Sequence, residues 1–354
     1  MGGGLMTNIE ICDSVPTFAS VSLPIMPLLT SSDYRPPRYL FNGHLQTIIP
    51  SQFRKIREIS YSRERISTED GDFLLLDWSS IKSSQLVIVS HGLEGDSHRP
   101  YILGMVRAFN RAGFDALAWN FRGCGGEINQ TYRFYHSGAT PDLHFLVNYV
   151  KNQYQYKSIV LVGFSLGGNL TLKYLGEQRE ALVNEVQAAV VFSVPLDLQA
   201  CSRKIAEPEN FIYSKRFLRN LKKKIRNKEA IMPDKISSEF FPQIRSLEDF
   251  DNYYTAPLHG FRNAADYYHQ CSSIRFLQSI RVPTLVVSAK NDPFLAPECY
   301  LTKESETTDY LHFQAPESGG HCGFMPRSYS SGQNFWSENR AVEFVNDVLV
   351  SHNN

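Results

Sequence analysis

The fold of this chain is decided by residues 159–170, which read IVLVGFSLGGNL. A run of branched apolar residues leads into Gly-Phe-Ser-Leu-Gly, and a helix-like pattern follows. A serine flanked by glycines at this spacing stands on a tight strand-to-helix turn, which lifts its hydroxyl above a sheet. The helix that follows directs the positive end of its dipole at the site, which favours developing negative charge. We therefore predict that Ser165 is a nucleophile.

Apolar runs and helical periodicities alternate along the rest of the chain. Continuously apolar runs are typical of strands covered on both faces, and apolar residues spaced by three and four are typical of helices. The predicted strands are 58–68, 73–78, 86–90, 116–120, 158–163, 188–194, 283–288 and 310–314, and the predicted helices are 101–112, 141–153, 166–178 and 335–350. This alternation predicts a mostly parallel eight-stranded sheet flanked by helices, the α/β-hydrolase fold.

The domain organisation predicted is a short arm followed by one catalytic domain. Residues 1–35 are dotted with Ser, Gly and Pro, which is typical of an arm, and residues 36–354 carry the α/β pattern. The gap between the strands 188–194 and 283–288 is too long for a structureless loop in a compact domain. Residues 197–280 therefore form a predicted helical cap over the carboxyl ends of the strands, where open α/β sheets bind ligands.

Charge and cysteine content exclude several classes of function. Lys plus Arg and Asp plus Glu each number 36, so no global charge attracts nucleic acid. The six cysteines stand singly and no spaced Cys/His set occurs, so we expect free thiols and no metal. Residues 123–126, Gly-Cys-Gly-Gly, lack dinucleotide-binding spacing, so we expect no cofactor.

The first basic residue is Arg35 and apolar runs near the N-terminus are short, which predicts a cytoplasmic location.

A second motif, VIVSHGLEG at residues 87–95, ends the third predicted strand. In this fold the loop after that strand supplies one backbone N–H to the oxyanion hole, and the residue after the nucleophile supplies the other. This rule selects the N–H groups of Leu93 and Leu166. His91 is assigned a role in shaping the loop rather than that of the base. The alternative interpretation of the motif is a plain strand-end turn.

A serine hydroxyl needs a base, and in this fold the chain order is Ser, then Asp or Glu, then His. His321 lies in the Gly-rich segment ESGGHCGF, residues 317–324, between the last predicted strand and the last helix. His312 lies inside a predicted strand, and His259 and His269 lie in the insertion. We therefore predict that His321 is the base.

Two aspartates follow strands in the right part of the chain. Asp292 comes after the strand 283–288, in a loop from which it can reach a base in the next loop. Asp197 comes after the preceding strand and is the rival, because some proteins of this fold place the acid there. For either residue the structural alternative is an aspartate that caps the next helix. We favour Asp292.

Beyond these motifs, several unusual stretches resemble the YheT-like and EMB8-like α/β hydrolases. They are RYLFNGHLQT at 38–47, HGLEG at 91–95, NFRGCGG at 120–126, HSG at 136–138 and YTAPLHGF at 254–261. The resemblance runs from about Tyr34 to the last helix. It implies the triad Ser165, Asp292 and His321 and the hydrolysis of carboxylic or lipid esters. Animal relatives of this family act on phospholipids.

The chemistry predicted is therefore that of an esterase or lipase acting on a small acyl ester or a lipid. A phospholipase or a thioesterase would use the same triad. The motif does not determine the leaving group, so these activities remain alternatives. The alternative from another class is a non-catalytic binding protein that keeps the fold.

Two further segments each allow two interpretations. In residues 120–126, Asn and Arg before glycines could bind a substrate carboxylate or phosphate, or they could brace the neighbouring loop. In residues 215–228, eight of fourteen residues are Lys or Arg, and apolar residues recur at spacings of three and four. Such a helix could touch an anionic membrane surface. We favour the alternative, in which the apolar stripe packs in the cap and the charges are solvated.

Overall fold

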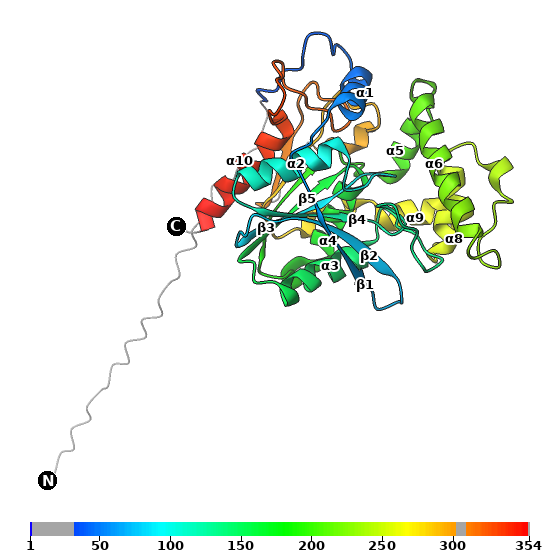
Figure 1. The fold of residues 1–354 in the computed structure, drawn as a ribbon, viewed down its shortest axis with the longest axis horizontal. Helices are drawn as coiled ribbons and strands as arrows, with labels where there is room; N and C mark the ends of the chain where they lie inside the picture. The colour runs from blue at the N-terminus through cyan, green and yellow to red at the C-terminus, as the bar shows by residue number, and fades with distance from the viewer. Residues whose placement is uncertain (2–31, 302–308, 353–354) are drawn as a thin grey trace.

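A computed structural model describes Met1 and residues 32–301 and 309–352. Most of the predicted arm, residues 2–31, lies outside the described residues. An eight-stranded sheet with the strand order β1-β2-β4-β3-β5-β6-β7-β8 crosses the molecule (Figure 1). Its strands are β1 (Ser62–Ser67), β2 (Phe73–Ser79), β3 (Gln85–Ser90), β4 (Asp115–Asn120), β5 (Ser158–Phe164), β6 (Val186–Phe192), β7 (Thr284–Val287) and β8 (Leu311–Gln314). β2 is antiparallel to both of its neighbours and the other pairs are parallel. The predicted fold class is confirmed.

Helices cover both faces of the sheet, which is why its central strands are apolar throughout. Along β3, Leu86 and Ile88 pack in one core cluster and Val87 and Val89 in the other, as alternation along a strand requires. The first cluster includes residues of α3 (Thr140–Gln153) and α4 (Leu166–Gln178). The second includes residues of α2 (Pro100–Arg111) and α10 (Trp336–His352). The result is a three-layer arrangement of helices, sheet and helices (Figure 1).

The segment between β6 and β7 forms a separate group of helices beyond one end of the sheet (Figure 1). Its elements are α5 (Leu198–Ala206), α6 (Phe211–Glu229), α7 (Leu247–Phe250), the π-helix η4 (Asp251–Thr255), α8 (Ala256–Leu258) and α9 (Ala264–Cys271). It has a small apolar core of its own, which includes Leu218, Ile225, Phe250 and Tyr254. We refer to these elements, α5 to α9, as the cap.

The basic segment 215–228 lies within α6, with its apolar residues packed inward and several of its cations exposed. Its apolar residues Leu218, Leu221 and Ile225 are buried in the cap core. The Lys222 ammonium donates to two backbone carbonyls of the cap at 3.0 and 3.1 Å. Because the apolar stripe faces inward, membrane contact through this segment would rest on its outward cations alone, and it stays a prediction. No helix of residues 32–301 or 309–352 is long and apolar enough to cross a bilayer.

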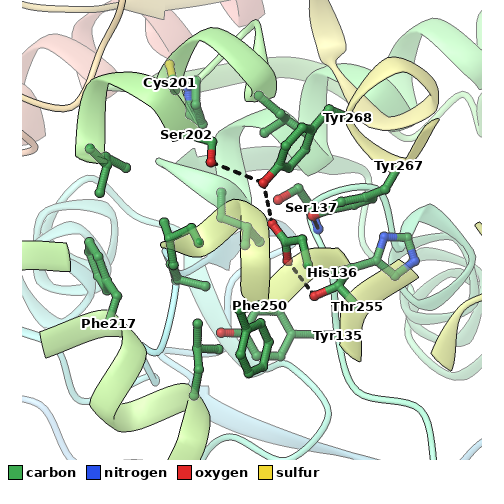
Figure 2. Close-up of a pocket in the computed structure, with 18 of the residues that line it drawn as sticks. Tyr135, His136, Ser137, Cys201, Ser202, Phe217, Phe250, Thr255, Tyr267 and Tyr268 are labelled. Atoms are coloured by element: carbon green, nitrogen blue, oxygen red, sulfur yellow. Dashed lines mark hydrogen bonds between the residues drawn. The ribbon is translucent and has the colours of Figure 1, made fainter. Parts of the chain in front are cut away.

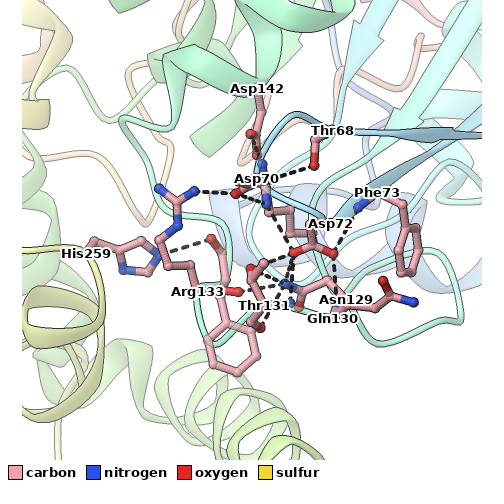
Figure 3. A network of polar contacts seen from close by, with 12 residues as sticks. Thr68, Asp70, Asp72, Phe73, Asn129, Gln130, Thr131, Arg133, Asp142 and His259 are labelled. Carbon is pink, nitrogen blue, oxygen red and sulfur yellow. Dashed lines mark hydrogen bonds and ion pairs between the residues drawn. The ribbon is translucent and has the colours of Figure 1, made fainter. Parts of the chain in front are cut away.

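Residues 120–126 brace the structure around them, so the bracing interpretation is confirmed. The Arg122 guanidinium donates two hydrogen bonds to Asp142, at 2.7 and 2.8 Å, and further bonds to Asp70 and Asp72. Figure 3 shows this network of carboxylates together with the loop at 129–131 that surrounds Asp72. The buried Lys228 of α6 donates to the Asn129 amide oxygen at 2.8 Å, so the network also anchors the cap. With three carboxylate partners, Arg122 is not free to bind substrate.

Helix α1 (Gly43–Phe53) is absent from the elements that the sequence predicts. It contains Pro50, and the residues it buries are mainly polar or small rather than apolar. Its N-cap is Asn42, whose side-chain oxygen accepts from the Leu45 N–H at 2.9 Å. The helix lies against the loops that follow β7 and β8. A Cβ atom on Gly43 would come within 2.0 Å of the Asn291 carbonyl oxygen.

Candidate active site

Ser165 stands at the junction of β5 and α4 with φ 53° and ψ −119°, a conformation that non-glycine residues rarely adopt. The turn is tight on both sides. A Cβ on Gly163 would lie 2.5 Å from the Gly167 carbonyl oxygen, and one on Gly167 would lie 2.5 Å from the carbonyl oxygens of Ser90 and His91. Glycine is therefore required at both positions. Strain of this kind persists where surrounding structure enforces it, which is typical of functional sites.

Asp292 and His321 come together at the ends of β7 and β8. The His321 Nδ1 lies 3.0 and 3.1 Å from the two carboxylate oxygens of Asp292. The Asp292 side chain is fully buried and that of His321 is 12% exposed. The Phe294 ring lies 4.3 Å from the imidazole, centroid to centroid, and limits its rotation. The two residues thus form an oriented pair, as a base and its acid partner require.

The pKa of His321 is set by opposing effects. Burial lowers it, because a low-dielectric environment disfavours the imidazolium. The negative charge of Asp292 and the neighbouring Cys322 raise it by more, so that the pKa stands at about 10 against an ordinary value of 6.5. Asp292 therefore stabilises the protonated imidazole, which is the species formed when a histidine takes a proton from serine.

The backbone N–H groups of Leu93 and Leu166 are both available near Ser165. Leu166 is the first residue of α4, so its N–H has no partner within the helix. Beside Leu93, the N–H groups of Gly92 and Glu94 are already occupied by Tyr101 and Tyr135 hydroxyls. Within the described part of the chain, neither Leu93 nor Leu166 donates its N–H to another residue. Both residues line the same cavity as Ser165.

His91 shapes the loop that carries Leu93, as expected. Its ring is fully buried, with Nδ1 at 2.8 Å from the Gly92 carbonyl, and its Nε2 accepts the Phe121 N–H at 3.2 Å. Burial lowers the pKa of His91 to about 4. A neutral ring that donates from Nδ1 and accepts at Nε2 satisfies both contacts.

The other candidate residues lie in structural positions. Asp197 caps α5 by accepting from the Ala200 N–H at 2.9 Å, which is the alternative role considered for it. In the cap, His259 contacts the Thr255 and Phe134 carbonyls, at 2.7 and 3.0 Å. His269 contacts Arg275 on the surface, and His312 is buried against Phe344.

Helix α1 supplies positioning residues that the sequence did not predict. The Gln46 side-chain oxygen accepts from the Gly319 N–H at 2.6 Å and from the Asn291 amide at 3.0 Å. The Thr47 hydroxyl oxygen accepts from the His321 N–H at 2.8 Å. One turn of helix therefore holds both the loop that carries Asp292 and the loop that carries His321. The only sequence signal for it was the conspicuous motif at residues 38–47.

An apolar cavity lies between the cap and the end of the sheet at Ser165. Ser165, His321, Leu93 and Leu166 line it on the sheet side. Aromatic side chains from the cap and neighbouring loops, labelled in Figure 2, line much of the rest: Tyr135, Phe217, Phe250, Tyr267 and Tyr268. A cavity of this composition suits a hydrocarbon chain.

Hydrogen bonds among cap residues hold this apolar wall in place. The Tyr268 hydroxyl lies 2.7 Å from an Asp251 carboxylate oxygen and 3.1 Å from the Ser202 hydroxyl. Burial raises the pKa of Asp251 to about 6, although donors from Thr255 and Tyr268 lower it. These contacts join α5, η4 and α9.

One ion pair ties the cap to the loop that carries Leu93. Lys224 of α6 lies 2.8 Å from the Glu94 carboxylate, and both side chains are almost buried. The Tyr135 hydroxyl donates to the same carboxylate at 2.7 Å. Burial lowers the pKa of Lys224, but the charge of Glu94 and the contact with Cys124 raise it by more. The position of the loop thus depends on a residue of the cap.

Metal-binding geometry is not seen in the described ranges, where no group of three or more His, Cys, Asp and Glu residues could hold an ion. The five cysteines of that part of the chain are free thiols, and Cys12 lies outside it.

Comparison with known proteins places this chain in a family. Residues 85–327 match the family model described as the alpha/beta hydrolase fold. The chain belongs to the α/β-hydrolase fold family. Among curated relatives, this α/β hydrolase is 33% identical to a putative esterase named YheT from Escherichia coli, over 90% of this chain and 95% of that protein. It is 28% identical to an embryogenesis-associated protein, EMB8, from Picea glauca, over 88% of this chain and 72% of that one. The resemblance to YheT-like and EMB8-like proteins is confirmed.

Other comparisons agree with this assignment of the α/β hydrolase. A mouse protein named phospholipase ABHD3 is 28% identical over 84% of this chain and 74% of that protein. Among solved structures, the esterase Pf2001 from Pyrococcus furiosus superposes with a TM-score of 0.55 at 18% identity, covering 82% of this chain and 92% of that one. At that identity the likeness concerns the fold alone.

Proposed function

We propose that this α/β hydrolase cleaves carboxylic esters, with Ser165 as nucleophile, His321 as general base and acid, and Asp292 as the acid that orients the base. The observation that carries the proposal is the buried Asp292–His321 pair, whose histidine lines the same cavity as a serine on a strained elbow. A binding protein has no need for an oriented carboxylate–imidazole pair beside such a serine. The names of the relatives, which include an esterase and a phospholipase, support the same chemistry.

In the proposed mechanism the Ser165 Oγ attacks the acyl carbonyl while the His321 Nε2 accepts its proton. Nδ1 keeps its hydrogen bond to Asp292, whose charge stabilises the imidazolium. The carbonyl oxygen becomes an oxyanion that accepts from the N–H groups of Leu93 and Leu166. The bond to the alcohol then breaks, and His321 gives its proton to the leaving oxygen. In the second half of the reaction, water deprotonated by His321 attacks the acyl carbonyl. The bond to the Ser165 Oγ breaks, His321 returns the proton to that oxygen, and the carboxylic acid is released.

The substrate class proposed is an acyl ester or lipid ester whose acyl chain lies in the apolar cavity. Aromatic and aliphatic side chains of the cap surround that space. Burying a methylene group there gains about 0.8 kcal/mol. Chain length within the cavity therefore contributes to specificity.

Covalent labelling tests the proposed function. An active-site-directed fluorophosphonate is expected to form one adduct, on the peptide that carries Ser165, because the oriented His321 activates that hydroxyl alone. Mass spectrometry of the digested protein locates the adduct, and prior unfolding in urea provides the control, since unfolding separates the serine from its base. A folded protein that takes up no label would be a binding protein with this fold, and an adduct elsewhere would move the site.

The pH dependence of catalysis follows from the His321 pKa. The base must be neutral to accept a proton, and its pKa is raised above 6.5 by Asp292. We therefore expect kcat/KM for a soluble ester to increase with pH between about pH 7 and pH 9, where unperturbed imidazole is already neutral. Stopped assays at constant ionic strength measure it, with intrinsic fluorescence as the check that the protein stays folded. An acidic limb centred at or below 6.5 would contradict this.

A further inference from the structure

A second pocket meets the apolar cavity at the proposed nucleophile. Ser165, His321 and Leu93 line both spaces, and Phe217 and Phe294 also contribute to both. An ester bound at Ser165 must direct its two halves away from the carbonyl carbon in different directions. With the acyl chain in the apolar cavity, the second pocket is left for the alcohol half.

The charges that line the second pocket do not balance. Its carboxylates already have partners: Glu338 forms two hydrogen bonds with Arg54, and Glu94 pairs with Lys224 of the cap at 2.8 Å. Two further cations line the pocket, Arg99 and Arg216. Over the described ranges of the chain, neither of them forms an ion pair.

The two guanidiniums lie in a setting that increases their positive potential. Arg99 donates to the Glu94 backbone carbonyl at 2.7 Å, which fixes it beside the loop that carries Leu93. Partial desolvation lowers the pKa of Arg216, and the charges of Arg99 and Arg219 lower it further, so the positive charges of these residues add at the pocket. Arg216 is exposed and comes from the cap, whereas Arg99 comes from the sheet side.

The start of α2 adds to this potential. Arg99 is its N-cap residue and Pro100 its first residue, and no side chain caps the helix there. Arg99, Pro100 and Tyr101 all line the second pocket. The first turn of a helix carries partial positive charge, which favours an anion nearby.

We propose that the second pocket receives the alcohol half of the substrate and that Arg99 and Arg216 select alcohols bearing an anionic group, a carboxylate or a phosphate. This inference rests on the proposed function, because it requires an ester bound at Ser165. Planar guanidiniums from opposite sides of a pocket can hold either oxyanion with charge-assisted hydrogen bonds. Binding such a group also relieves the repulsion between the two cations. The apolar cavity offers no equivalent charge, since its lysine, Lys224, is paired.

A matched pair of esters tests the proposal. One is the acyl ester of para-hydroxybenzoate, whose alcohol half is anionic, and the other is the same acyl ester of para-hydroxybenzamide, which is nearly the same shape but neutral. We expect the native protein to prefer the anionic ester in kcat/KM. In the double variant Arg99→Gln, Arg216→Gln the anionic-to-neutral ratio should fall about tenfold, as expected for two partly exposed charge contacts. The ratio in the native protein should also fall as salt is added.

Arg219→Gln is the control. Arg219 is exposed, lies on the same helix and does not line the pocket, so its removal should change the ratio little. If the anionic-to-neutral ratio depended on the total positive charge of α6 rather than on the pocket residues, Arg219→Gln would lower the ratio as much as the double variant does.

A second substrate pair separates phosphate from carboxylate recognition. A monoacylglycerol phosphate and the matching monoacylglycerol differ only in the anionic group. Preference for the phosphate ester that is lost in the double variant assigns the pocket to phosphate; preference confined to the benzoate ester assigns it to carboxylate. If the native protein shows no preference in either pair, or if the double variant keeps the native ratios, the inference is overturned while labelling of Ser165 leaves the proposed function standing. Failure to label Ser165 would instead remove both.

Discussion

Replacing Ser165 with alanine is expected to lower kcat about a millionfold, the loss typical of removing a serine nucleophile. The reason is that the acyl-enzyme cannot form without the hydroxyl, whatever the state of His321. Alanine keeps the turn and its strained φ of 53°, so the melting temperature should hardly change. Steady-state hydrolysis of a soluble ester and circular dichroism on the same preparation measure the two quantities.

The control for this substitution is Ser351→Ala, an exposed serine on α10 far along the chain from the site. It should keep native kcat and native stability. If Ser165→Ala retained substantial turnover, the nucleophile would have to be another group in the cavity. If the variant unfolded, the elbow would depend on the hydroxyl for its stability, which nothing in its contacts suggests.

Asp292→Asn is expected to reduce kcat by about four orders of magnitude, which is the loss that this change causes in the Ser-His-Asp triad of a serine protease. The amide has nearly the shape of the carboxylate, but it lacks the charge that raises the pKa of His321 and that stabilises the imidazolium. It also favours the wrong tautomer of the ring. Single-turnover kinetics on an activated ester, with KM measured alongside, separate this loss from any effect on binding.

The matched control is Asp197→Asn, because that aspartate was the rival candidate and caps α5. Asparagine caps a helix about as well as aspartate. We therefore expect almost native turnover and a small change in melting temperature. A reversal, with the large loss at Asp197, would transfer the role of acid to the loop after β6.

Much of the fold could be predicted because its strands are buried on both faces. β5 is buried at every position and its sequence is almost entirely apolar, so the sequence alone predicted a strand covered on both faces of the sheet. β3 is buried except at its first residue, β4 is buried throughout, and the interior of each strand is apolar. The glycines around Ser165 also carried information, since only a close approach of strand and helix requires both of them.

Helix α1 could not be predicted because its pattern is not that of an amphipathic helix. Its interior face consists of Gly43, Gln46, Thr47 and Pro50, which periodicity does not register as a core. The polar side chains are buried because they satisfy backbone groups of the loops at 291 and 319–321. A helix that buries hydrogen-bonding groups for another segment leaves no hydrophobic signal of its own.

The long-range partners of buried cations could not be predicted from the sequence either. The sequence predicts solvated charges along residues 215–228, yet Lys224 and Lys228 cross to Glu94 and to the loop at 129–131. Arg122 likewise has a ligand-like setting in the sequence but meets three aspartates in the structure. Local spacing shows that a charge exists; which buried carboxylate or carbonyl it reaches depends on the completed fold.

The contacts of Gln46 and Thr47 with the loops that carry Asp292 and His321 bear on how the proposed site is assembled during synthesis. The helix that carries them is translated before Asp292 and His321, because the contacts of Gln46 and Thr47 with Gly319 and His321 span 273 and 274 residues. Until those loops return to α1, a nascent chain has an elbow serine but no base in register with it. In the proposed mechanism, hydrolysis therefore begins only when these distant parts of the domain have met, and a chain that stops before residue 291 would carry Ser165 without its proposed base.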